Sequence, residues 1–214
     1  MKRLFIMCSL FSLAVTFVFV LTIHDFLSIT QRVPAEVLVV EGWGYDSPAI
    51  AEAADEFKRG GYRVLLTVGG PAVVGDKNTE RVSYAVLAAN RLKALGVEPQ
   101  SMIALSGPDV AHHHTYSSAL TVRDWLKQSE TSIKGINVFT LGPHARKSLV
   151  LFTRALGSAY PVGVIAGTDH DYDPKRWWLS TRGIYIIARK TVGYIYAVIW
   201  PLPEEMSEGT TSSS

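Results

Sequence analysis

Two titratable side chains, Glu41 and His144, each follow a short run of mostly apolar residues, where a buried strand should end. Glu41 comes directly after Val37–Val40, and His144 comes shortly after Ile136–Leu141. Such runs are typical of strands buried on both faces of a parallel sheet. Because ligands bind outside the carboxyl ends of strands in open α/β sheets, we expect Glu41 and His144 to share one site as its catalytic residues.

Glu41 has two interpretations that the sequence leaves open. It could act as a general base or hydrogen-bond a ligand hydroxyl. It could instead cap the helix that follows or pair with Arg146, with no role in chemistry.

A predicted anion clamp consists of His144, Arg146 and Lys147, at the start of a helix. Cations at this end oppose the helix dipole, so an anion bound between them would relieve the conflict. Thr115 and Tyr116 open another helix, whose free N–H groups could bind the same anion. The alternative for Thr115 is that its hydroxyl simply caps this helix.

Glycines near the expected strand ends would let a ligand approach the backbone, although tight turns use glycines in the same way. Glu80 lies near a helix start, where a carboxylate also stabilises the helix without any function. The predicted ligand-binding residues are Gly42, Gly69, Gly70, Glu80, Thr115, Tyr116, Arg146 and Lys147.

Two clusters invite a metal-site interpretation that we do not favour. His112–His114 are adjacent on a loop, and neighbouring residues of an extended chain point in different directions, so we predict solvated histidines and no zinc. Asp169, Asp171 and Asp173 are interpreted as an acidic turn. We expect no metal, and since no Walker loop or G-x-G-x-x-G fingerprint occurs, no cofactor.

Composition excludes some classes of protein. The net charge of +2 and the pI of 8.6 are too mild to indicate a nucleic-acid partner. Cys8 is the single cysteine of the chain, which excludes an intramolecular disulfide.

Five expected strands alternate with helices, and this alternation must position the candidate residues. The strands are expected at residues 37–40, 63–68, 101–105, 136–141 and 162–166. With right-handed crossovers the pattern predicts an α/β fold with a doubly wound, Rossmann-like parallel five-stranded sheet, and we prefer strand order 3-2-1-4-5. We expect a cap at Asn78 or Thr79 for the helix after the second strand, and a final helix over residues 177–200.

Residues 4–23 carry no charge and follow Lys2 and Arg3. A helix of this length spans about 30 Å, the thickness of a bilayer core. A cleaved signal peptide and a buried helix are alternatives, but no A-x-A-like cleavage site follows and no polar face exists. We therefore expect one N-terminal transmembrane helix in the inner (plasma) membrane, with a cytoplasmic N-terminus and the domain on the outer side. The expected organisation is an anchor at 1–30, a domain at 31–200 and a disordered polar tail at 201–214.

The order of these motifs resembles the YdcF/SanA/ElyC family of bacterial envelope proteins. The resemblance covers about residues 35–200, including the segment Tyr172–Trp178. Matching positions are Gly42, Gly69, Gly70, Glu80, Thr115, Ala119 and His144. Ser118, Lys147 and Lys190 depart from residues that the family often has.

The resemblance implies a membrane-anchored envelope protein that binds an anionic ligand, phosphorylated or nucleotide-like, in cell-wall or lipid-carrier metabolism. It brings no defined reaction with it. The alternative hypothesis is a non-catalytic anchored scaffold whose partners are wall-synthesis proteins.

Overall fold

The computed structural model describes residues 2–72, 82–129 and 132–199. Glu80, the expected caps Asn78 and Thr79, and the expected tail at 201–214 lie outside the described residues.

The described chain contains one sheet of five parallel strands in the order β3-β2-β1-β4-β5. This order and the helices on both faces confirm the predicted doubly wound, Rossmann-like class. The strands are β1 (Val37–Glu41), β2 (Val64–Gly69), β3 (Met102–Ser106), β4 (Ile136–Leu141) and β5 (Val162–Gly167).

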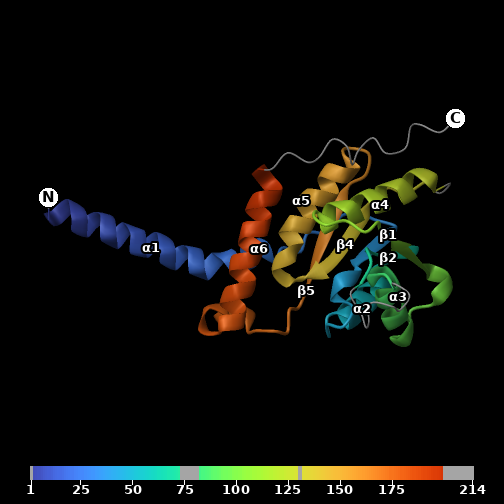
Figure 1. Ribbon diagram of the computed structural model, residues 1–214, viewed down its shortest axis with the longest axis horizontal. Coiled ribbons are helices and arrows are strands. Elements are labelled where there is room, and N and C mark those ends of the chain that lie inside the picture. The colour runs from blue at the N-terminus through green and yellow to red at the C-terminus, as the bar shows by residue number, and fades with distance from the viewer. Residues whose placement is uncertain (1, 73–81, 130–131, 200–214) are drawn as a thin grey trace.

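Strand β1 is buried along its whole length because helices cover both of its faces. Val37 and Val39 belong to the core on the side of helices α4 (His114–Gln128) and α5 (Ala145–Leu156). Leu38 and Val40 pack on the side of helices α2 (Ile50–Arg59) and α3 (Tyr84–Ala94). This division follows from the alternation of side chains along a strand. Figure 1 shows the sheet between these two layers of helices.

Besides the sheet, the described residues form six α-helices and four short 3-10 helices, joined by turns and loops. The α-helices are α1 (Lys2–Leu27), α2 (Ile50–Arg59), α3 (Tyr84–Ala94), α4 (His114–Gln128), α5 (Ala145–Leu156) and α6 (Thr181–Ile199). The 3-10 helices are η1 (Gly42–Gly44), η2 (Pro99–Ser101), η3 (Gly142–His144) and η4 (Pro174–Leu179).

Two helix starts differ from the expectation. Helix α3 begins at Tyr84, because the Ser83 hydroxyl accepts a hydrogen bond from the Val86 N–H at 3.2 Å and so caps it. The final helix is interrupted at Ser180, where the extended backbone ends η4 and the hydroxyl accepts from the Gly183 N–H.

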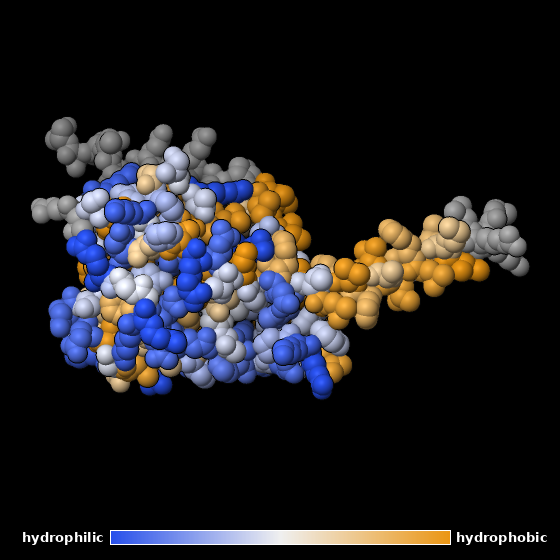
Figure 2. All heavy atoms as spheres, turned by 180° about the vertical axis from the view of Figure 1, so that it is seen from behind, coloured by the Kyte–Doolittle hydropathy of each residue, from blue (hydrophilic) through white to orange (hydrophobic). Residues whose placement is uncertain are grey.

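Helix α1 projects from the domain, and the segment Phe5–Leu27 has a mean hydropathy of 2.5, long and apolar enough to cross a membrane. Figure 2 shows its hydrophobic surface. The last turn of α1 is different, because Ile23 and Leu27 are buried in a cluster with residues of η4 and α6. The expected boundary at residue 30 therefore separates residues that pack together.

Candidate functional site

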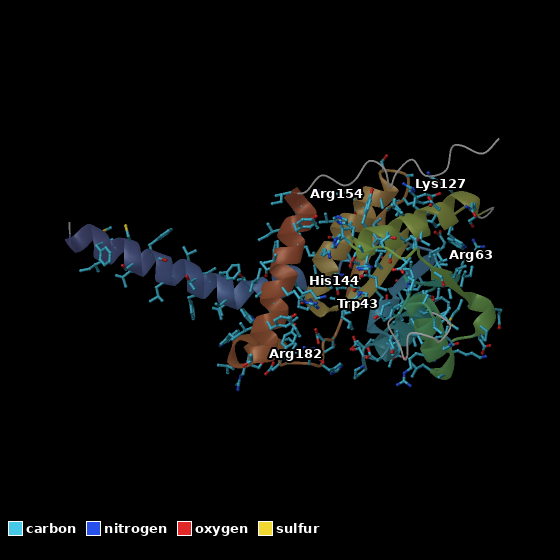
Figure 3. The ribbon with its side chains drawn as sticks, viewed as in Figure 1. Trp43, Arg63, Lys127, His144, Arg154 and Arg182 are labelled. Carbon is cyan, nitrogen blue, oxygen red and sulfur yellow. The ribbon has the colours of Figure 1, made fainter. Side chains whose placement is uncertain are left out.

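A cavity of about 930 Å³ lies at the carboxyl edge of β1 and β2, between the start of α4, the start of α5 and α6. Its charged and polar lining includes Glu41, Thr115, His144, Lys147, Arg189 and Lys190. Figure 3 shows Trp43 and His144 close together, between α6 and the sheet. The structure therefore brings the two predicted catalytic residues, Glu41 and His144, into one cavity, as their positions at strand ends predicted.

Glu41 ends β1 and is only 5% exposed. The Ser148 hydroxyl donates a hydrogen bond of 2.5 Å to Glu41 Oε2. Burial raises the pKa of Glu41, although Ser148 and the charges of Lys147 and Lys190 oppose the rise. Glu41 makes no cap to η1, and Arg146 binds elsewhere, so the alternative interpretation of Glu41 as a cap or an Arg146 partner was wrong.

His144 is buried and contacts three polar groups. Its Nε2 lies 3.3 Å from Thr115 Oγ1 and 3.9 Å from Glu41 Oε2, and its Nδ1 lies 3.2 Å from Lys190 Nζ. Burial, followed by the charges of Lys190, Lys147 and Arg189, lowers the pKa of His144 well below its ordinary value. The imidazole is therefore neutral near pH 7, and with an ammonium donating to Nδ1, its own proton belongs on Nε2.

Lys190 projects from α6 into the cavity, where its Nζ lies 4.4 Å from the centroid of the Trp43 ring. Burial, followed by the charge of Arg189, lowers the pKa of Lys190 to about 7, and Glu41 partly opposes this shift. The Trp43 ring also meets His144 edge to face, at 5.1 Å between centroids and 82° between planes. Trp43 thus packs against both groups and limits their movement.

The structure brings two of the three residues of the predicted anion clamp, His144 and Lys147, into the cavity, but not Arg146. Lys147 lines the cavity, and burial lowers its pKa while Glu41 raises it. Arg146 instead donates to the Phe26 carbonyl oxygen and places its guanidinium 3.9 Å from the centroid of the Phe26 ring. Successive residues of a helix are turned by about 100°, and Arg146 accordingly points toward α1 while Lys147 lines the cavity. Arg189 and Lys190 of α6 take the place predicted for Arg146.

Of the two residues predicted at the start of α4, Thr115 lines the cavity and Tyr116 does not. Helix α4 begins at His114, and its N-cap is His113 with a left-handed backbone (φ 61°) and no side-chain cap. The Thr115 hydroxyl therefore does not cap α4 but faces His144 inside the cavity. Tyr116 is buried in the core beside Leu120 and does not line the cavity.

The predicted glycines also differ in whether they line the cavity. Gly69 and Gly70 line the cavity. Gly42 does not, because it packs on the start of α3, where a Cβ would collide with the Tyr84 carbonyl oxygen. Close packing of η1 on α3 accounts for Gly42.

The histidine loop borders the cavity, and the His113 ring stacks on Tyr196 at 5.8 Å between centroids. Within the described ranges, no group of three or more His, Cys, Asp or Glu side chains is arranged to hold a metal ion. The absence of zinc stays a prediction. In the acidic turn, Asp171 pairs with Arg182, and Asp173 accepts from the Lys175 N–H.

Sequence reasoning missed Trp43, Ser148, Arg189 and Lys190 as site residues. Arg189 and Lys190 stand in the middle of α6, between apolar and tyrosine residues. Charged residues within an apolar helix were the available indication that one of these cations reaches a buried polar site. Ser148 carries no such indication, because a serine on a helix is ordinary.

The fold and the cavity define an α/β protein of the doubly wound class with a polar, cation-rich site at the carboxyl edge of its sheet. Comparison of the chain with protein-family models and with curated proteins found no match.

Proposed function

We propose that this chain is a membrane-anchored protein of the cell envelope that binds a small anionic ligand, phosphorylated or nucleotide-like, in the cavity beside α6. The observation that carries the proposal is the charge of the lining. Among the described residues, Lys147, Arg189 and Lys190 line the cavity with Glu41 as the one carboxylate. We call these three the cavity cations. The resemblance to the YdcF/SanA/ElyC family supports the envelope setting.

An anion would stabilise this arrangement of charges. The cavity cations repel one another, and burial penalises the charge of Lys147 and Lys190. A bound phosphate group would offset both effects through charge-assisted hydrogen bonds. The N-terminus of α4 adds backbone N–H groups and the positive end of its dipole at the same wall.

Two further groups can orient such a ligand. Neutral His144 offers an Nε2–H toward Thr115 and Glu41. The indole Nε1 of Trp43 is buried and has no hydrogen-bond partner among the described residues, so it is free to donate. If the site catalyses a reaction, Glu41 is the group to accept a proton from a ligand hydroxyl or water, because it is the one carboxylate of the lining among the described residues and burial raises its pKa.

Thermal unfolding of the full-length protein in detergent tests the anion site. Inorganic phosphate and nucleoside diphosphates, at matched ionic strength, should raise the melting temperature by mass action. Lys190→Gln and Lys147→Gln should remove most of this shift. Lys127→Gln is the matched control, since Lys127 is exposed on α4 far from the cavity (Figure 3). Equal melting-temperature shifts in all three variants would mean that the added anion acts only as an ordinary salt, and this would exclude the site.

Membrane anchoring needs its own experiment. The full-length protein should stay in the membrane fraction after a carbonate wash, and a reporter fused to the C-terminus should be active outside the cytoplasm. Release by carbonate would contradict the anchor, and a cytoplasmic reporter would contradict the orientation.

The scaffold hypothesis stays as the alternative function. A protein that only contacts wall-synthesis proteins should tolerate Glu41→Gln and His144→Gln in cells, provided that both variants fold. An envelope defect in cells that carry either variant, when the variant folds normally, would favour the ligand-binding function.

A further inference from the structure

One side of α6 faces away from the domain and carries no charged residue. We call it the outer face of α6, and it consists of Ile184, Tyr185, Ala188, Val192, Ile195 and Ile199. Val192 is 67% exposed, Ile199 72% and Ile195 49%. The exposed side of a helix on a globular domain is normally polar, so this pattern is inverted.

The inner side of α6 makes the contrast clear. Ile186, Ile187 and Ala197 are buried against the domain, and Lys190 reaches the cavity from the same side. Packing on the domain therefore does not explain the apolar residues of the outer face. A contiguous apolar surface that the protein itself leaves uncovered indicates a partner with an apolar component.

The position of α1 identifies that partner. Ile23 and Leu27 of α1 share a buried cluster with Ile186 and Ile187 of α6, and partly buried Val20 packs against it, so the part of α1 that is free of the domain ends near Phe19. From Phe5 to Phe19 an α-helix rises about 22 Å, which is most of the roughly 30 Å hydrocarbon core of a bilayer. If α1 spans the membrane, no spacer separates the membrane surface from α6.

The direction of α6 fits this surface. In Figure 1, α6 runs across the direction of α1, on the side of the domain from which α1 leaves. Figure 2 shows hydrophobic side chains on the domain next to the base of α1. A helix that crosses the axis of a transmembrane segment lies along the membrane plane.

We propose that the outer face of α6 rests on the lipid bilayer beside α1, at the boundary between headgroups and acyl chains. This inference depends on the proposed anchoring by α1. Tyr185 suits this depth, and exposed Arg189, 5.7 Å from the centroid of the Tyr185 ring, can reach lipid phosphates. Because Arg189, Lys190 and Tyr196 also line the cavity, this placement brings the cavity wall to the headgroup layer.

Fluorescence quenching in the full-length protein tests the proposal. Cys8 is replaced by alanine, and one cysteine is introduced by Val192→Cys, Ile195→Cys or Arg63→Cys and labelled with an environment-sensitive fluorophore. The protein is placed in phosphatidylcholine–phosphatidylglycerol vesicles with or without a nitroxide on the upper acyl chain. Arg63 is the control, since it is exposed on the side of the domain away from α6 (Figure 3).

The labels at 192 and 195 should lose most of their fluorescence to the nitroxide lipid and emit at shorter wavelength, while the label at 63 should not change. Unquenched labels at 192 and 195 in protein that withstands a carbonate wash would overturn the docking of α6 and leave the anchor intact. Release by carbonate would overturn the anchor and the docking together. Labels shielded from the nitroxide, with cross-linked dimers through position 195, would show that a second copy covers this face and would also overturn the proposal.

Discussion

Lys190 is held where three influences act against its charge: burial, Arg189 and Lys147. The amine nevertheless stays beside Trp43 and His144, which together give it a π face and a nitrogen acceptor. A lysine with a pKa of about 7 changes its charge within the physiological range, so the anion affinity of the cavity should depend on pH.

The pH dependence of stability follows from the same shift. The folded protein holds the Lys190 pKa at about 7, whereas the unfolded chain has the ordinary value near 10.5, so the unfolded state binds more protons between these values. The free energy of unfolding of the wild type should therefore rise, relative to Lys190→Met, as the pH increases from about 7 to about 10. Thermal melts across this range compare the two proteins, and parallel curves would contradict the shift.

Affinity should change in the opposite direction. As Lys190 loses its proton above about pH 7, the cavity loses one of its three cations. Phosphate binding to the wild type, measured by calorimetry, should weaken as the pH rises from 6 to 8, beyond the change seen with Lys190→Gln. A wild type and variant with equal pH profiles would exclude Lys190 as the titrating ligand group.

Ser148→Ala removes the hydroxyl that donates to the buried Glu41 carboxylate. A buried acceptor that loses its donor costs about 1–3 kcal/mol of stability. The loss should be smaller at low pH, where protonated Glu41 no longer needs a donor. Denaturant unfolding at neutral and acidic pH measures both effects, and Ser129→Ala, outside this hydrogen bond, is the control.

At the scale of elements, the apolar runs and their alternation with helices predicted all five strands and their order. Val37–Val40 and Ile136–Leu141 are neighbours in the sheet as expected, because the order 3-2-1-4-5 puts β1 beside β4. Gly157 ends α5 with a positive φ of 62°, a conformation that favours glycine. The site was less predictable, since two of its three cations come from α6 and depend on how that helix rotates over the sheet, which no local pattern encodes.

Helix starts were also hard to predict, because several residues can cap. We expected the cap at Asn78 or Thr79 and not at Ser83, although serine has the same preference for the N-cap. The structure selects Ser83, whose hydroxyl also lies 2.7 Å from Ser106 Oγ at the end of β3. A tertiary contact thus accompanies the cap.

The contact of η1 with α3 gives a prediction at this scale. Gly42→Ala would drive a methyl group into the Tyr84 backbone at the start of α3, and overpacking of this kind costs about 1–3 kcal/mol. Gly107→Ala is the control, because the nearest atom to its Cβ would be Thr121 Oγ1 at 3.4 Å. Denaturant unfolding should show a clear loss for Gly42→Ala alone. Similar midpoints for the two variants would mean that α3 shifts at little cost.

At the scale of the whole molecule, the end of α1 is part of the domain. A chain that begins at Gln31 lacks Ile23 and Leu27 and exposes the apolar cluster around Trp177. Each buried aliphatic side chain contributes roughly 1.5–3 kcal/mol, so this shorter chain should unfold at clearly lower denaturant than one that begins at Leu21. Equal unfolding midpoints would show that the last turn of α1 is not needed.

The same cluster constrains the order in which parts of the domain can fold during synthesis. Leu27 is made early and Ile187 late, and the two meet only when the final helix exists. At about 5–20 residues per second, synthesis of the intervening chain takes on the order of ten to thirty seconds. The sheet can form in that interval, but the closure that joins the two ends of the domain must come last. Until then Ile23 and Leu27 have no partner from α6, and the apolar cluster of the newly synthesised domain is incomplete.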